Sequence, residues 1–150
     1  MEKALLRKYL LETPRCLLRE MDEDDAEAVF RLNLHPDVFI FTTDPPFKNV
    51  EEATIFIRNY DEYRKHGMGR WAVDLKSTGA FIGWCGLRYL PEEKETDIGY
   101  RFLPEFWGQG FATETACRCI EYGFETGLTR IVARVHKENQ RSIRVSEKLN

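Results

Sequence analysis

The sequence has no long hydrophobic run. Its first segment, MEKALLRKYLLE, is apolar for only a few residues before Arg7 and Lys8 interrupt it. A signal peptide or a membrane span needs a longer uninterrupted apolar stretch. We therefore expect a cytoplasmic protein that has no membrane partner.

The sequence is also poor in the signals of metal and nucleic-acid binding. Its four cysteines, Cys16, Cys85, Cys117 and Cys119, form no C-x-x-C pair and no metal-type spacing. We expect free thiols in a reducing compartment, and no metal site. The formal net charge of −3 argues against an electrostatic nucleic-acid binder.

No internal repeat, low-complexity tract or linker divides the chain. Its 150 residues are 43% hydrophobic and 31% charged, which is ordinary for a globular protein. This length suits one hydrophobic core. We expect a single domain over residues 1–150, in which residues 1–12 form an N-terminal extension.

Hydrophobic periodicity predicts alternating groups of helices and strands. The predicted elements are a strand at 15–20, helices at 21–33 and 50–66, strands at 70–75, 80–87 and 95–102, a helix at 112–125, a strand at 130–136 and a helix at 139–149. KSTG at 76–79 reads as a hairpin turn. In the helix at 112–125 the expected buried stripe is Ala112, Ala116, Cys119, Ile120, Gly123 and Phe124. This order predicts an α+β fold with a mixed, mainly antiparallel sheet flanked by helices.

The segment WGQGFATE contains two glycines, Gly108 and Gly110, directly before a predicted helix. The start of a helix leaves backbone N–H groups unpaired and carries partial positive charge, so it binds phosphate. Glycine lets the chain approach such a ligand closely. The pattern predicts a diphosphate site, although a G-x-G can also be a simple turn between strand and helix.

Other nucleotide-binding loops fit less well. The dinucleotide pattern G-x-G-x-x-G fails at Thr113, and the preceding strand TDIGYRF alternates instead of reading as a continuous apolar run. No G-x-x-x-x-G-K-[ST] motif occurs. A dinucleotide oxidoreductase therefore remains only a third possibility, one that would bind NAD.

The stretch IGYRFLPEFWGQGFATETA closely resembles the acetyl-CoA-binding motif of the GNAT N-acetyltransferases. It is most similar to the branch of the ribosomal-protein N-terminal acetyltransferases, whose form is W-G-x-G-[YF]-A-T-E-A. TPRCLLREMDEDDAEAV resembles the opening strand and helix of that branch, GRWAVDLKSTGAFIGWCGL its central hairpin, and NQRSIRVSEKL its N-x-x-S helix. The resemblance covers residues 13–149 in order and implies the GNAT fold.

The sequence departs from the family pattern at three places. Trp107 stands where many members carry Arg or Gln, so the resemblance implies that backbone amides bind the diphosphate. Ser146 stands where many members carry a tyrosine acid. The family's fold continues into two further strands after its last helix, whereas this sequence stops at Asn150, so the last two strands are expected to be missing. Either the chain is truncated or only partly recorded, or something else covers the exposed strand edge.

The resemblance implies acetyl-CoA as co-substrate and direct attack of a primary amine on its thioester in a ternary complex. Residues 108–113 would bind the diphosphate, and the main chain at 102–104 would pair with the pantetheine arm. A backbone N–H near Arg101 or Phe102 would stabilise the oxyanion. The implied cofactor-binding residues are Phe102, Leu103, Pro104, Trp107, Gly108, Gln109, Gly110, Phe111, Ala112, Thr113, Asn139 and Ser142.

Three residues are catalytic candidates. Asp97, ahead of Glu95, matches a strand that carries the base in several family members, although it also reads as a surface residue. Asn139 would hold the cofactor arm, cap the last helix, or do both. Ser142 would contact the cofactor and donate a proton to the leaving thiolate, or it is a solvated helix serine.

The acceptor side is expected in the aromatic loop HPDVFIFTTDPPF, where family members form much of their acceptor pocket. The candidate residues are Phe39, Phe41, Asp44 and Phe47. The acceptor would be a protein N-terminal amine or a small-molecule amine, and the protein a monomer or a homodimer. A non-catalytic acyl-CoA-binding or sensing module of the same fold is the alternative.

Overall fold

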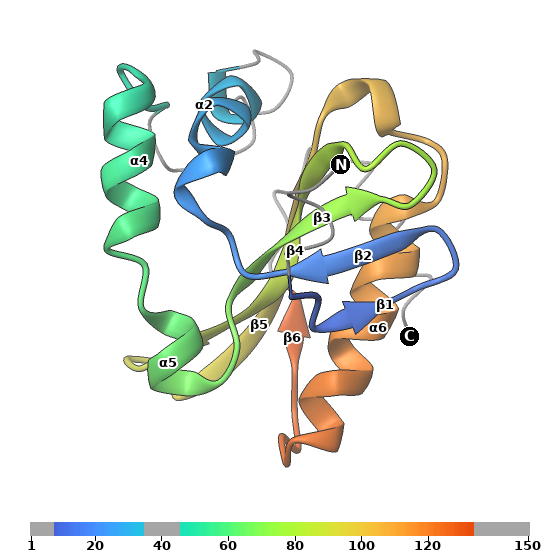
Figure 1. Cartoon of the computed structure of the whole chain (residues 1–150). Helices are drawn as coiled ribbons and strands as arrows, with labels where there is room; N and C mark the ends of the chain where they lie inside the picture. Colours follow the sequence, from blue (N-terminus) through green and yellow to red (C-terminus); the bar gives the residue numbers. More distant parts are fainter. Residues whose placement is uncertain (1–7, 35–45, 134–150) are drawn as a thin grey trace.

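The computed structural model describes residues 8–34 and 46–133. Within these described residues, six strands form one sheet in the order β1-β2-β3-β4-β5-β6 (Figure 1). The strands are β1 Leu11–Glu12, β2 Cys16–Arg19, β3 Arg70–Leu75, β4 Phe81–Leu90, β5 Glu95–Phe102 and β6 Val132–Ala133. The helical segments are η1 Glu23–Asp25, α2 Ala26–Leu34, α4 Val50–Arg58, α5 Glu62–His66, η2 Pro104–Phe106 and α6 Phe111–Glu125.

Strands β1 to β5 are antiparallel to their neighbours, and β6 runs parallel to β5. Tight turns join β3 to β4 and β4 to β5, whereas the crossover from β5 to β6 contains α6, as a parallel connection requires. The predicted mixed, mainly antiparallel sheet is confirmed. Strand β4 is longer than predicted, because its pairing with β5 continues through Tyr89 and Leu90.

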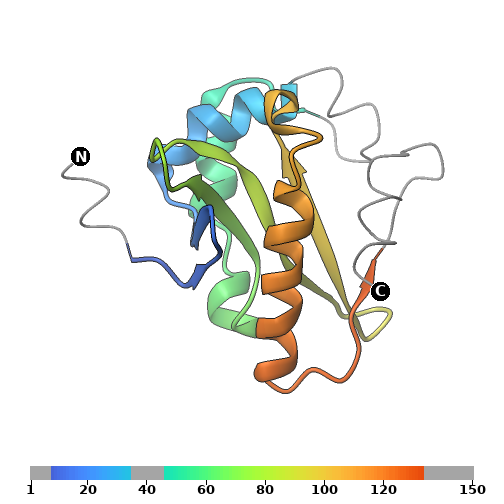
Figure 2. The same cartoon turned by 90° about the vertical axis from the view of Figure 1, so that its right-hand side faces the viewer.

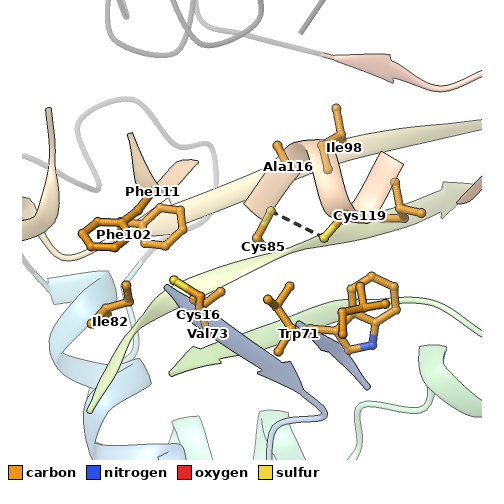
Figure 3. Close-up of a cluster of buried hydrophobic side chains, with 13 residues drawn as sticks. Cys16, Trp71, Val73, Ile82, Cys85, Ile98, Phe102, Phe111, Ala116 and Cys119 are labelled. Atoms are coloured by element: carbon orange, nitrogen blue, oxygen red, sulfur yellow. Dashed lines mark hydrogen bonds between the residues drawn. The ribbon is translucent and has the colours of Figure 1, made fainter. Parts of the chain in front are cut away.

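Helix α6 covers one face of the sheet, and α2 and α4 lie on the other (Figures 1 and 2). The core under α6 combines side chains from strands β1 to β5 with the inner face of the helix, and Figure 3 shows this cluster. In β5, Ile98 and Phe102 point into this core, as the alternation of the strand predicted.

The predicted buried stripe of α6 is partly wrong. Phe124 is 49% exposed, whereas Phe111 and Thr115 are buried. Thr115 tolerates burial because its hydroxyl donates to the carbonyl of Phe111 at 2.8 Å. Gly123 faces the core so closely that an added Cβ would lie 2.9 Å from Ile131, and Phe124 is therefore turned toward solvent.

The predicted helix at 50–66 is broken into α4 and α5. Asn59 ends α4, and the main-chain N–H groups of Arg64 and Lys65 bond to the Asp61 carbonyl to start α5. Two tyrosines fix the chain at this break: the Tyr60 hydroxyl accepts from the Arg70 N–H at 2.9 Å, and the Tyr63 hydroxyl donates to the Arg70 carbonyl. The break follows from these tertiary bonds, which the local sequence does not reveal. Gly67 ends α5 with a φ of 67°, a left-handed conformation that glycine commonly adopts at the end of a helix.

A buried ion cluster attaches η1 and α2 to the sheet. Arg19 of β2 bonds Asp25 of η1 through both terminal nitrogens at 2.8 Å, and Asp74 of β3 through Nε at 2.8 Å. All three side chains are at most 3% exposed. Burial alone would lower the pKa of Arg19, but the hydrogen bonds and charges of Asp25 and Asp74 outweigh it and raise that pKa.

Arg19→Ala should lower the free energy of unfolding by about 3–5 kcal/mol, because it leaves two buried carboxylates without their cation. Urea denaturation followed by circular dichroism measures this loss. Arg58→Ala is the control, since it removes an exposed ion pair with Glu23 and should barely shift the midpoint. Equal midpoints for Arg19→Ala and the unmodified protein would contradict this account of the cluster.

Candidate functional site

The loop between β5 and α6 holds both glycines of the predicted phosphate site. Gly108 and Gly110 have φ values of 74° and 85°, a left-handed conformation that glycine adopts without strain. Gly110 is the N-cap of α6 and provides no side-chain cap, and the first helical bond runs from the Glu114 N–H to the Gly110 carbonyl at 3.0 Å. The N–H groups of residues 111–113 therefore have no acceptor within the helix. The predicted glycine loop directly before a helix is confirmed, and the helix starts at Phe111, one residue earlier than predicted.

The loop is anchored to the end of β5 by Trp107. Its indole Nε1 donates to the carbonyl of Phe102 at 2.9 Å, and its main-chain N–H donates to the carbonyl of Pro104 at 3.0 Å. Gln109 adds a side-chain bond to the carbonyl of Glu105 at 2.9 Å. Trp107 therefore shapes the loop, a role that its sequence position alone did not indicate.

The register of β4 and β5 decides which main-chain donors remain at residues 102–104. Leu103 donates its N–H to the Ile82 carbonyl at 3.0 Å, and proline at 104 has no N–H. Gly83 is opposite Phe102, and the Leu103 bond makes this a non-hydrogen-bonded pair. The Phe102 N–H consequently points away from β4, toward the side on which β6 pairs with Asp97 and Ile98.

The first turn of α6 is tied to the turn between β1 and β2. Glu114 accepts from the Thr13 hydroxyl at 2.6 Å, from the Arg15 N–H at 2.9 Å and from Arg15 Nε at 2.8 Å. Burial alone would raise the pKa of Glu114, but these hydrogen bonds and the charge of Arg15 outweigh burial and lower it. The Arg15 guanidinium also lies 4.0 Å from the centroid of the Phe111 ring.

The sequence analysis did not predict this contact, although the motifs on both sides of it are present in the sequence. Thr13 and Arg15 belong to the TPR of the opening strand, and Glu114 is the acid of the FATE motif. No local pattern shows that two segments about a hundred residues apart meet. Their charge complementarity was the available signal.

The opposite face of β5 carries Asp97, Gly99 and Arg101. Asp97 is buried and pairs with Arg88 of β4 at 3.1 Å. Arg101 donates to the Asn33 side-chain oxygen at the end of α2. Phe47 packs on Phe56 of α4, with ring centroids 5.5 Å apart. Phe39, Phe41, Asp44, Asn139 and Ser142 lie outside the described residues.

The four cysteines are free thiols, as predicted, and three of them are buried. The Sγ atoms of Cys85 and Cys119 lie 3.7 Å apart beneath α6 (Figure 3). Burial raises the pKa of Cys16 to about 11 and that of Cys119 well above its usual value. A thiol must ionise to act as a nucleophile, so neither Cys16 nor Cys119 suits covalent catalysis.

Two further features concern metals and membranes. Within residues 8–34 and 46–133, no group of three potential metal ligands comes together. None of the described helices is long and apolar enough to cross a membrane.

Known proteins share this sequence and this fold. The family model of the acetyltransferase (GNAT) domain matches residues 15–150. The uncharacterized N-acetyltransferase YoaA of Bacillus subtilis is 32% identical over 143 residues, which cover 93% of this chain and 81% of YoaA. The uncharacterized N-acetyltransferase p20 of Bacillus licheniformis is 33% identical, with coverage of 93% and 80%.

Solved structures agree with these matches. A GNAT acetyltransferase from Bacillus anthracis superposes with a TM-score of 0.81 at 28% identity, over 93% of this chain and 81% of that one. RimL, a ribosomal L7/L12 α-N-protein acetyltransferase in complex with coenzyme A, has a TM-score of 0.81 at 19% identity, over 95% and 83%. Spermidine N-acetyltransferase from Vibrio cholerae, in complex with CoA and spermine, superposes with a TM-score of 0.75 at 20% identity. The match covers 90% of this chain and 79% of that one.

The last two likenesses concern the fold alone, because their identities are low. The family match, the relatives above 30% identity and the glycine loop at the start of α6 agree on one conclusion. The chain belongs to the GNAT family of N-acetyltransferases.

Proposed function

We propose that this enzyme moves an acetyl group from acetyl-CoA to a primary amine by direct attack in a ternary complex. The observation that carries the proposal is the pair of left-handed glycines directly before the N–H groups of residues 111–113, which have no acceptor within α6. An added Cβ at Gly108 would meet no atom within 4 Å, so the backbone there faces open space. This geometry fits a diphosphate.

The chain's own groups divide the remaining tasks. Acetyl-CoA, when bound, supplies an acetyl group activated as a thioester. The Phe102 N–H, directed away from β4, is suited to donate to the pantetheine arm or to the developing oxyanion. Asn139 and Ser142 keep the roles that the family resemblance implies, in holding the cofactor arm and protonating the thiolate.

Asp97 is our proposed proton acceptor. It lies on the face of β5 opposite α6, and its pairing with Arg88 fixes the carboxylate in place. An α-amine has a pKa of about 7.7–8.0 and is partly neutral near pH 7, whereas a lysine amine at about 10.4 is almost fully protonated. A carboxylate that is held in an ion pair is a weak base, and a weak base suits an α-amine better than a lysine amine. We therefore place protein N-termini first among acceptors, in line with the resemblance to the ribosomal-protein branch, and small amines second.

Replacing Gly108 should weaken CoA binding. Gly108→Val would strain the left-handed backbone and cover the proposed phosphate site, so we expect the Kd for CoA, measured by calorimetry, to rise about tenfold or more. Gly79→Val is a matched control, because Gly79 has the same φ of 74° and equally open surroundings in the β3–β4 turn. It should lose similar stability and keep its affinity for CoA. Unchanged affinity in Gly108→Val would refute the diphosphate assignment.

Incubation with acetyl-CoA and a panel of amines should release free CoA. The panel contains N-terminal peptides, amino acids and polyamines, and mass spectrometry identifies the acetylated product. We expect turnover that depends on the amine. Tight CoA binding without turnover on any amine would instead support the acyl-CoA-sensing alternative.

Asp97→Asn should slow acetyl transfer by about 10²-fold or more at pH 7, because general-base catalysis contributes on this order. The defect should shrink as pH rises toward 9, since more of the amine is then neutral in solution. Glu95→Gln, on the same strand, should keep the native pH profile. A pH-independent defect in Asp97→Asn would mean that Asp97 serves only the structure.

A further inference from the structure

The Arg15 guanidinium lies directly beside the glycine loop. Its Nη2 atom would be 3.4 Å from a Cβ built on Gly110, the N-cap of α6. Its Cζ atom lies 4.0 Å from the centroid of the Phe111 ring, and Phe111 is the first residue of that helix. These two contacts place the guanidinium next to the N–H groups of residues 111–113, which have no acceptor within the helix.

The ion pair with Glu114 leaves the terminal nitrogens of Arg15 available. Glu114 accepts from Thr13 and from the Arg15 main chain, and it bonds the guanidinium only through Nε, at 2.8 Å. Among residues 8–34 and 46–133, no hydrogen bond involves Nη1 or Nη2 of Arg15. A guanidinium has five N–H donors, so the groups on these two nitrogens can still bind an anion.

The glycine loop has no cation of its own. Residues 103–114 contain no lysine or arginine and two acids, Glu105 and Glu114. Cofactor phosphates at this loop would meet side-chain charges of their own sign, unless a neighbouring segment supplies the opposite sign. Arg15 supplies it, and it is the more exposed member of its ion pair: its side chain is 43% exposed, against 16% for Glu114.

The arginine is held in this position by the core. The Phe111 ring under the guanidinium is 5% exposed and lies 6.1 Å from the Phe106 ring, centroid to centroid. A guanidinium stacked on an aromatic ring keeps its edge N–H groups available for an anion. Because Glu114 fixes Nε and Phe111 supports the flat face, little side-chain freedom is left to lose when a ligand binds.

We propose that Arg15 binds a phosphate of coenzyme A through its terminal nitrogens, beside the N–H groups at the start of α6. The inference rests on the proposed use of acetyl-CoA. Coenzyme A carries a diphosphate and a 3′-phosphate on its ribose, and the forked donors of a guanidinium suit either group. Arg15 thus adds a full positive charge, from the turn between β1 and β2, to a site that main-chain donors begin.

Calorimetric titration with CoA tests this proposal. Arg15→Gln should raise the Kd for CoA about tenfold or more, because it removes a charged hydrogen bond to a phosphate. Arg15→Lys should keep part of the affinity, since it retains the charge but not the forked donors. Arg64→Gln, which removes an exposed charge from α5, is the control for net charge and should bind CoA normally. An unchanged Kd in Arg15→Gln would overturn the proposal.

Variants of Glu114 separate a phosphate contact from a purely structural role. Glu114→Gln should bind CoA at least as tightly as the unmodified protein, because it removes a negative charge beside the loop. Adding Arg15→Gln to this variant leaves no carboxylate without its cation, and it should still raise the Kd about tenfold. If Glu114→Gln itself weakens binding and Arg15→Gln adds no further loss, Arg15 acts only through the ion pair, and the assignment is wrong.

A CoA analogue without the 3′-phosphate identifies the group that Arg15 contacts. If Arg15→Gln weakens binding of CoA and of 3′-dephospho-CoA by the same factor, the contact is to the diphosphate. If it weakens binding of CoA alone, the contact is to the 3′-phosphate. Either result supports a phosphate contact.

The inference and the proposed function can fail separately, because CoA binding needs no acceptor. If no amine is acetylated, the titrations still test Arg15. A raised Kd in Arg15→Gln with an unchanged Kd in Gly108→Val would keep the arginine contact and refute the glycine site. The reverse pair of results would keep the glycine site and refute only the role of Arg15.

Discussion

The close approach of β4 and β5 at Gly83 fixes the geometry on which the site depends. A Cβ on Gly83 would lie 2.3 Å from the Arg101 carbonyl oxygen, so a larger residue would push the two strands apart. With the strands this close, Leu103 completes the ladder on Ile82, and Phe102 directs its N–H to the other side. The chain then turns through η2 into the glycine loop. The register of β4 and β5 thus determines both the direction of the Phe102 N–H and the position of the N–H groups at the start of α6.

The two faces of the sheet carry different chemistry. The face under α6 is apolar and holds buried, unreactive thiols, so it provides rigidity and no reacting group. The other face holds Asp97, Arg101 and Trp84, and its helices are attached through the buried charges of Arg19, Asp25 and Asp74. Asp25 and Asp74 neutralise Arg19, whereas the guanidinium of Arg70 lies near the rings of Phe56 and Trp84.

Strong local signals made much of the fold predictable. The alternation in ETDIGYRF and the turn KSTG located β5 and the β3–β4 hairpin, and the two glycines located the start of α6. Tertiary contacts decided what the sequence alone could not show. Tyr60 and Tyr63 break a helix that periodicity would continue, and the phase of α6 is set by Phe111 against Phe106. Arg15 and Arg70 matter through partners on distant segments, which no short pattern reveals.

The bond between Thr13 and Glu114 joins positions 101 residues apart. During synthesis, Thr13 leaves the ribosome before Glu114. The interval between them is on the order of 5–20 s at typical elongation rates. The turn between β1 and β2 is therefore synthesised early, but its hydrogen bond to Glu114 can form only later. A nascent chain carries the opening strand well before it contains α6 and the proposed cofactor site, so a bound cofactor would favour only a fold that already includes α6.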